Sequence, residues 1–200
     1  MPMQFEDLKK YQLILASKSP RRQFLLKDLG LNFDVKTKEV DESFPNDLTA
    51  QAIPLYLSEK KAHAFDEELN DNTIVITADT IVWVENKVLN KPENQEDAIR
   101  MLKLLSGKMH EVYTGVCLKS KHKTKSFSVK TTVYFKTLSD YEIDYYVTNH
   151  KPYDKAGAYG AQEWIGYIAV EKIEGSYFNV MGLPLKELYE ELLSFQPEFD

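Results

Sequence analysis

Strand-like and helix-like segments alternate along this chain of 200 residues, and the connections between them are short. The strongest strand signal is the apolar, β-branched run Thr73–Val84, which a turn candidate at Glu85-Asn86-Lys87 joins to the short apolar pair Val88-Leu89. The strongest helix signal is an amphipathic segment that Asn94 caps and Gly107 ends. Because the two kinds of element alternate, we predict an α/β fold in which helices flank a mixed, twisted and partly parallel sheet.

The remaining elements are predicted from the same periodicities and from capping residues. Strands are expected at residues 12–16, 33–36, 110–119, 126–137 and 167–170. One helix should start at Ser19-Pro20, an N-cap followed by proline at the first helical position, and end at Gly30. Further helices are expected to end near Leu69, with Pro54 as a kink or as the start, and to cover residues 140–149 and 184–193. Residues 119–125 should form a basic, solvated hairpin tip.

Composition limits the classes of protein to which the chain can belong. A hydrophobic content of 43% suffices for one well-cored domain over residues 1–200, or for two lobes around a cleft. No apolar run is long enough to span a membrane, and no secretion signal is evident. The single cysteine, Cys117, excludes an intramolecular disulfide and suits a reducing cytoplasm. A net charge of −6 argues against a general nucleic-acid binder, so an anionic ligand must meet a local basic cluster.

The first candidate site lies at the start of the first predicted helix. Two of the three arginines of the chain, Arg21 and Arg22, fall in its first turn, where the helix dipole already places partial positive charge. An anion would make this arrangement favourable, because backbone N–H groups, two guanidinium groups and the hydroxyls of Ser17 and Ser19 could converge on phosphate oxygens. The alternative is a pair of solvated arginines beside an ordinary N-cap.

The second candidate is Asp79, in the segment Thr77-Ala78-Asp79-Thr80 of the β-branched run. A carboxylate inside such a run must be paired, protonated or bound to a metal, because an isolated buried charge is costly. Glu42, in an acidic loop, could supply a second hard oxygen ligand, and magnesium sites typically combine one or two carboxylates with substrate phosphates. The alternative is an aspartate at a sheet edge that faces water.

Two lysines and one glycine-punctuated segment complete the candidates. Lys61 belongs to a Lys-Lys pair on a helix, Lys91 directly precedes Pro92, and both could equally be solvated surface charges. In residues 154–162, small side chains would let the backbone approach a flat ligand, and Gln162 offers one acceptor and two donors. The alternative for this segment is a structural loop. The four histidines, His63, His110, His122 and His150, show neither metal-site spacing nor a nucleophile partner.

Together these segments resemble the Maf family, once described as septum-formation proteins, over residues 15–193. The resemblance rests on seven stretches in the order of the family, which makes chance agreement improbable. They are ASKSPRR with the following Leu25-Leu26, Ala78-Asp79-Thr80, Lys91-Pro92, Leu105-Ser106-Gly107, the segment 154–162, Gly175-Ser176-Tyr177 and Gly182-Leu183-Pro184-Leu185.

The resemblance implies a two-lobed α/β fold of the inosine-triphosphatase type, with a nucleoside triphosphate in the cleft and magnesium or manganese on its phosphates. The implied reaction releases a nucleoside monophosphate and pyrophosphate. Asp79 stands at the position of the general base and, with Glu42, of the metal ligands. Arg22, Lys61 and Lys91 match positions that contact phosphate and metal, and Ser17, Ser19 and Lys155 are expected to bind phosphate beside them. The resemblance also allows a homodimer.

Arg21, Thr80 and Gln162 match the positions that set base specificity in the family. Arginine at the first and glutamine at the last look like the dTTP/UTP branch, whereas the 7-methylguanosine branch carries tryptophan and glutamate there. The chain departs from the family pattern at Glu163, where glycine is common, and at Ala161, where isoleucine is common. Two alternatives from other classes are a nucleotide-binding regulator of cell division without turnover and a phosphotransferase that uses the same basic cluster.

Overall fold

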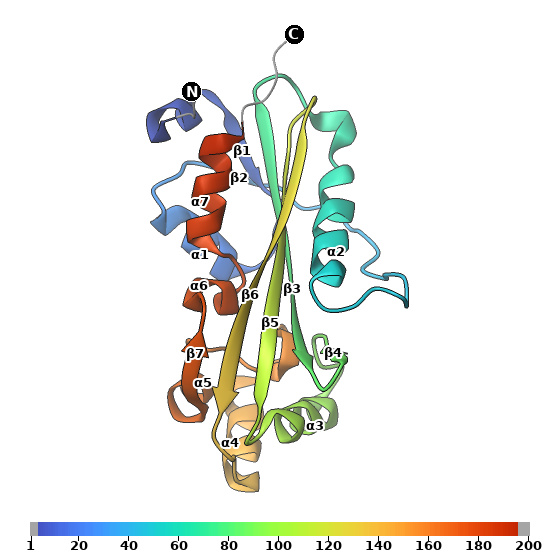
Figure 1. The fold of residues 1–200 in the computed structure, drawn as a ribbon, viewed down its shortest axis with the longest axis vertical. Coiled ribbons are helices and arrows are strands. Elements are labelled where there is room, and N and C mark those ends of the chain that lie inside the picture. Colours follow the sequence, from blue (N-terminus) through green and yellow to red (C-terminus); the bar gives the residue numbers. More distant parts are fainter. Residues whose placement is uncertain (1–3, 196–200) are drawn as a thin grey trace. The chain divides into compact units, whose positions relative to one another are not determined.

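The computed structural model describes residues 4–195, which divide into two compact units (Figure 1). Of the described residues, unit 1 comprises 4–79, 114–129 and 182–195, and unit 2 comprises Thr80–Tyr113 and Lys130–Met181. Three long strands contribute residues to both units; they are β3 (Thr73–Val84), β5 (Met109–Lys119) and β6 (Thr124–Phe135).

Within the described residues the strands form one seven-stranded sheet in the order β2-β1-β3-β5-β6-β7, with β4 paired to β3. The short strand β1 (Gln12–Leu15) runs parallel to β2 (Asp34–Val35) and to β3. The pairs β3 with β4 (Lys87–Leu89) and β6 with β7 (Val170–Glu174) are antiparallel. The predicted mixed sheet with flanking helices is therefore confirmed.

The first α-helix of unit 1, α1 (Pro20–Asp28), begins at the predicted N-cap. Ser19 accepts a hydrogen bond from the Arg22 backbone amide, and Pro20 takes the first helical position. Gly115 on β5 allows the segment around Pro54 to pack closely against this strand, because a Cβ atom on Gly115 would lie 2.3 Å from the Pro54 carbonyl oxygen. The helices of this unit are η1 (Phe5–Lys10), α1 (Pro20–Asp28), α2 (Ala52–His63), η2 (Asp66–Glu68) and α7 (Leu185–Ser194).

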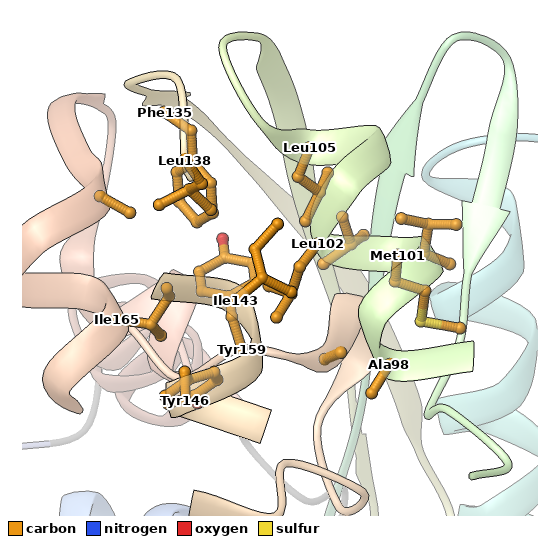
Figure 2. Packing of buried hydrophobic residues seen from close by; sticks show 14 of the residues in the cluster. Ala98, Met101, Leu102, Leu105, Phe135, Leu138, Ile143, Tyr146, Tyr159 and Ile165 are labelled. Atoms are coloured by element: carbon orange, nitrogen blue, oxygen red, sulfur yellow. The ribbon is translucent and has the colours of Figure 1, made fainter. Parts of the chain in front are cut away.

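Unit 2 has its own apolar core, part of which Figure 2 shows. The core side chains come from the amphipathic face of α3 (Gln95–Leu105) and from α4 (Asp140–His150), which contributes the ring of Tyr146 (Figure 2). The buried rings of Phe135 and Tyr159 belong to the same core. The helices of this unit are α3 (Gln95–Leu105), α4 (Asp140–His150), η3 (Ala156–Ala158), α5 (Trp164–Ala169) and α6 (Tyr177–Met181).

Two local predictions are wrong. Residues 167–169 belong to helix α5, and the strand begins only at Val170. A short apolar run does not distinguish strand from helix by periodicity, and here Gly166 allows the helix to pack closely, since a Cβ on it would lie 2.0 Å from the Ala161 carbonyl oxygen. The basic tip is not uniformly solvated either. Lys119 is buried and pairs with Asp66 at 3.0 Å, so the turn contains only residues 120–123.

The other predicted elements are present with shifts of a few residues at their ends. Helix α2 begins at Ala52, so Pro54 lies in its first turn, which confirms the reading of this proline as the start. Helix α6 was not predicted. The Cys117 thiol is buried, and its burial raises its pKa to about 11, as expected for a packed strand residue. Over residues 4–195, no helix is both long enough and apolar enough to cross a membrane.

Candidate active site

Unit 1 contains the predicted phosphate site at the start of α1. The Ser17 hydroxyl accepts a hydrogen bond from the Ser19 backbone amide at 3.2 Å, and its carbonyl oxygen accepts one from the Gln23 side chain at 3.1 Å. Ser19 in turn caps the helix through the Arg22 amide at 3.5 Å. The two serines therefore shape the turn that leads into α1, and their hydroxyls lie at its first amides.

Arg22 joins three segments of unit 1. Its Nε donates to the Gly182 carbonyl oxygen at 2.8 Å, and its Nη1 donates to the Ala78 carbonyl oxygen at 2.8 Å. Burial lowers the pKa of the guanidinium, and the nearby carboxylate of Asp79 opposes that shift. Because a guanidinium carries five N–H donors, these two bonds fix its plane without using all of its donors. The neighbouring Arg21 contributes a second positive charge at the same helix turn.

Asp79 lies on β3 and is paired with Lys61, which also contacts Glu42. The Lys61 Nζ is 2.5 Å from the Asp79 Oδ1 and 2.8 Å from the Glu42 Oε1. Side-chain exposure is 17% for Lys61 and 13% for Asp79, but 52% for Glu42. Of the possibilities that the sequence left open for Asp79, the structure shows the paired one. One ammonium group is therefore held between two carboxylates.

A buried hydrogen bond explains why Lys61 faces Asp79. The Thr77 hydroxyl donates to the Ser58 carbonyl oxygen at 2.6 Å and so fixes α2 against β3. Asp79 lies two residues after Thr77 on the strand and Lys61 lies three residues after Ser58 on the helix, and each spacing returns to the same face. The bond therefore brings the carboxylate and the ammonium together.

The donor set of Asp79 and Glu42 fits a hard divalent cation. Carboxylate oxygens are the protein ligands that magnesium prefers, and one or two of them with substrate phosphates make a typical site. The Lys61 ammonium already stands between these two carboxylates as a monovalent cation. Among the residues the structure describes, no group of three or more His, Cys, Asp and Glu side chains could hold a metal, so this pair would need phosphate oxygens to complete the coordination.

Unit 2 contains the other predicted residues: Thr80, Lys91, Lys155 and Gln162. The Gly157 amide donates to the Asn90 carbonyl oxygen at 3.1 Å, which places the segment 154–162 beside the chain that leads to Lys91. A Cβ on Gly157 would lie 2.9 Å from a methyl group of Val82, so only glycine allows this approach. The small residues of the segment thus pack against protein in this region.

Lys155 and Gln162 have surroundings that the sequence did not predict. The Lys155 Nζ lies 2.6 Å from Asp154 and 2.9 Å from Glu163, so its charge is already paired. The Gln162 carbonyl oxygen accepts from the Tyr167 hydroxyl at 2.6 Å. Its side-chain Oε1 is buried without a hydrogen-bond partner in the described part of the chain. A buried acceptor without a partner is costly. A hydrogen-bond donor on a ligand would remove this cost.

Sequence reasoning missed two contributors to these sites. Glu163 appeared only as a departure from a family pattern, and the structure makes it the partner of Lys155. Gly182 appeared only as part of a motif, and its carbonyl oxygen holds Arg22. In both cases the sequence drew attention to the residue, but it gave no chemical role for it.

Comparison with known proteins gives the family. The family model described as Maf-like protein matches residues 12–195. This chain belongs to the Maf family. A dTTP/UTP pyrophosphatase of Parabacteroides distasonis is 51% identical over 95% of this chain and 99% of its own length. One of Flavobacterium johnsoniae is 54% identical over 94% and 96%. Among solved structures, a HAM1 protein from Coxiella burnetii superposes with a TM-score of 0.47 and 14% identity, covering 91% of this chain and 98% of that one.

Proposed function

We propose that this chain is a dTTP/UTP pyrophosphatase, which hydrolyses a nucleoside triphosphate to the monophosphate and pyrophosphate. The observation that carries the proposal is the Glu42–Lys61–Asp79 arrangement, with two carboxylates around one ammonium beside a helix start rich in cationic groups. Relatives about half identical over nearly their whole length carry the name dTTP/UTP pyrophosphatase, which supports the same reaction.

The reaction requires an activated water and a stabilised leaving group. Asp79 orients a water molecule and takes its proton as the water oxygen bonds to the α-phosphorus. The bond from that phosphorus to the oxygen bridging to the β-phosphate breaks, and pyrophosphate leaves with the bonding electrons. Arg22 and Lys61 of unit 1 hold the β- and γ-phosphates, where their positive charges stabilise the leaving group. A phosphate contact of Lys91, in unit 2, stays a prediction from the sequence. Ser17 and Ser19 offer hydroxyl groups to the same phosphates.

Asp79 and Glu42 would hold a divalent cation, magnesium or manganese, together with phosphate oxygens. When bound, this cation supplies positive charge that neutralises the triphosphate. With the cation held by both carboxylates, the Lys61 ammonium would be available to contact phosphate.

The base site in unit 2 is proposed to include Thr80 and Gln162, and a role of Arg21 in base selection stays a prediction from the sequence. Uracil and thymine present an N3–H donor between two carbonyl acceptors, and a side-chain amide can answer both. The buried Oε1 of Gln162 is suited to accept from N3–H. We further infer that residues 1–200 act as one Maf-like domain, since the family match over residues 12–195 extends through both units. A reducing cytoplasm stays a prediction from the single cysteine. A homodimer stays a prediction.

The test is a panel of canonical and modified nucleoside triphosphates in which the released phosphate and pyrophosphate are distinguished. We expect pyrophosphate from dTTP and UTP, with activity that excess chelator abolishes. Asp79→Asn should lower kcat at least about a hundredfold while nucleotide binding persists, because the amide loses basicity and metal affinity. The matched control is Asp71→Asn, an exposed aspartate paired with Lys121, which should leave kcat unchanged.

Three outcomes would contradict the proposal. Release of single phosphate would indicate a different bond cleavage, and phosphate transfer to an acceptor would indicate a phosphotransferase. Near-normal turnover in Asp79→Asn would remove this residue from the mechanism. Binding without any product in a single-turnover incubation with excess protein would favour the regulator.

A further inference from the structure

Three side chains of unit 2 form a closed hydrogen-bonded cluster around the turn that carries Gln162. The Tyr146 hydroxyl, from α4, donates to Glu163 Oε2 at 2.5 Å and accepts from the Gly160 amide at 3.2 Å. The Lys155 Nζ contacts the other oxygen of Glu163 at 2.9 Å. Glu163 thus uses both carboxylate oxygens, one toward a helix and one toward the start of the segment 154–162.

The same side chains lie directly on the backbone of Gly160. A Cβ atom there would lie 2.9 Å from Glu163 Cδ and 3.1 Å from Lys155 Cε. The Glu163 amide donates back to the Gly160 carbonyl oxygen at 3.0 Å, which closes residues 160–163 into a turn. Gln162 is inside this turn, one residue before Glu163. Side chain and main chain of Glu163 therefore both fix the peptide that carries Gln162.

Burial and charge make this cluster a strong constraint. The side chains of Lys155 and Glu163 are 9% and 24% exposed, and a second carboxylate, Asp154, also contacts Lys155. The Lys155 ammonium thus has both of its carboxylate partners within the segment 154–163. Burial, and then the carboxylate of Glu163, raise the pKa of Tyr146, so its hydroxyl keeps the proton that it donates. The cluster thus assigns Lys155 to the turn.

We propose that Glu163 is a positioning residue for base selection, which holds the Gln162 amide in the orientation that reads a uracil or thymine edge. The inference rests on the proposed function, because it takes Gln162 as the residue that reads the base. A freely rotating side-chain amide can present either its oxygen or its nitrogen, and would then also accept cytosine. Fixing the peptides on both sides of Gln162 sets the direction in which its side chain leaves the main chain, and so limits the amide orientations that can reach the base.

The test combines amide hydrogen exchange with base selectivity in Glu163→Ala, Glu163→Gln and Tyr146→Phe. The control is Glu171→Gln, an exposed glutamate on β7. Without nucleotide, exchange at the Gly160 and Glu163 amides should rise about tenfold or more in Glu163→Ala, because opening of the turn becomes easier. The ratio of kcat/KM for UTP to that for CTP should fall about tenfold, mainly through KM. Glu163→Gln should lie between wild type and alanine, since one amide oxygen replaces two carboxylate oxygens.

Selectivity is also measured without turnover by calorimetry, as the dissociation constant of CTP divided by that of UTP. If wild type binds UTP preferentially but hydrolyses nothing, the proposed function fails, and a fall of this ratio in the variants still supports the role of Glu163. Unchanged exchange, an unchanged UTP/CTP ratio, or no preference in wild type overturns the inference. If Glu163→Ala does not fold, Tyr146→Phe supplies the same test. This variant removes the hydroxyl that accepts from the Gly160 amide and retains the charges of Lys155 and Glu163.

Discussion

Replacing Lys61 by methionine tests whether its ammonium holds the two carboxylates of unit 1 together. Methionine keeps most of the aliphatic stem and removes the charge between Asp79 and Glu42. Breaking a fully buried ion pair by removing one partner costs about 3–5 kcal/mol, because the remaining charge is left uncompensated. Here Glu42 is half exposed and Asp79 stays near the Arg22 guanidinium. We therefore expect a loss of about 2 kcal/mol in the free energy of unfolding.

The adjacent residue supplies the matched control. Lys60, on the same helix, contacts Asp41 at 3.2 Å, and that aspartate is 71% exposed. Exposed pairs of this kind contribute about 0–1 kcal/mol. Lys60→Met should therefore lower the free energy of unfolding by no more than about 1 kcal/mol. For a chain of this length, the expected losses correspond to about 4–8 °C in Tm for Lys61→Met and to about 4 °C or less for the control.

The assay is thermal unfolding of wild type and both variants in chelator and in a magnesium or manganese titration. A cation that binds only the folded chain stabilises it by RT ln(1 + [L]/Kd). Since Lys61→Met removes the competing ammonium, its Tm should rise more with added cation than that of wild type. Equal destabilisation of the two variants, or an equal cation response in Lys61→Met and wild type, would refute the reasoning.

Two further predictions concern unit 2. Gln162→Glu should weaken kcat/KM for UTP and dTTP by about 1–3 kcal/mol, because a carboxylate cannot donate to a ring carbonyl; equal pyrimidine activity in both proteins would exclude Gln162 from the base pocket. The second concerns the buried His110, whose Nε2 lies 2.7 Å from the Tyr159 hydroxyl. Burial lowers the pKa of His110 from 6.5 to about 3. Since the unfolded chain binds the proton more readily, stability is lost as pH falls below 6.5, by roughly 2 kcal/mol between pH 7 and pH 5. Denaturant unfolding of His110→Gln should lack this component, and an identical pH dependence in the variant would contradict it.

Local chemistry made most of the fold predictable from the sequence. Ser19 and Asn94 cap their helices through side-chain oxygens as expected, because capping depends on residues within one turn. The hairpin of β3 and β4 likewise follows from adjacent residues, with positive φ at Glu85 and Asn86 in its turn. At residues 167–169 the residue types did not reveal the helix, which depends on a close backbone approach between Gly166 and Ala161.

Candidate site residues were predictable by type, whereas their partners were not. The sequence marks Asp79 as a carboxylate that must be compensated, but it gives no means of choosing Lys61 over another cation. That choice depends on the Thr77–Ser58 hydrogen bond, which joins residues 19 positions apart. The pairing of Lys155 with Glu163 was equally hidden, because the glutamate had no role in the pattern that identified the lysine.

The contacts of the cations in unit 1 also set how an anionic ligand can be accepted. Arg22 donates to the Gly182 and Ala78 carbonyl oxygens, and these two bonds fix the plane of its guanidinium. The Lys61 ammonium instead stands between two carboxylates, and a triphosphate that approaches it alone would meet those negative charges as well. A divalent cation held by Asp79 and Glu42 together with the triphosphate would remove this conflict, because it would supply positive charge to both the carboxylates and the phosphates. Binding of nucleotide and of cation should therefore be mutually dependent, each raising the affinity for the other by the same factor.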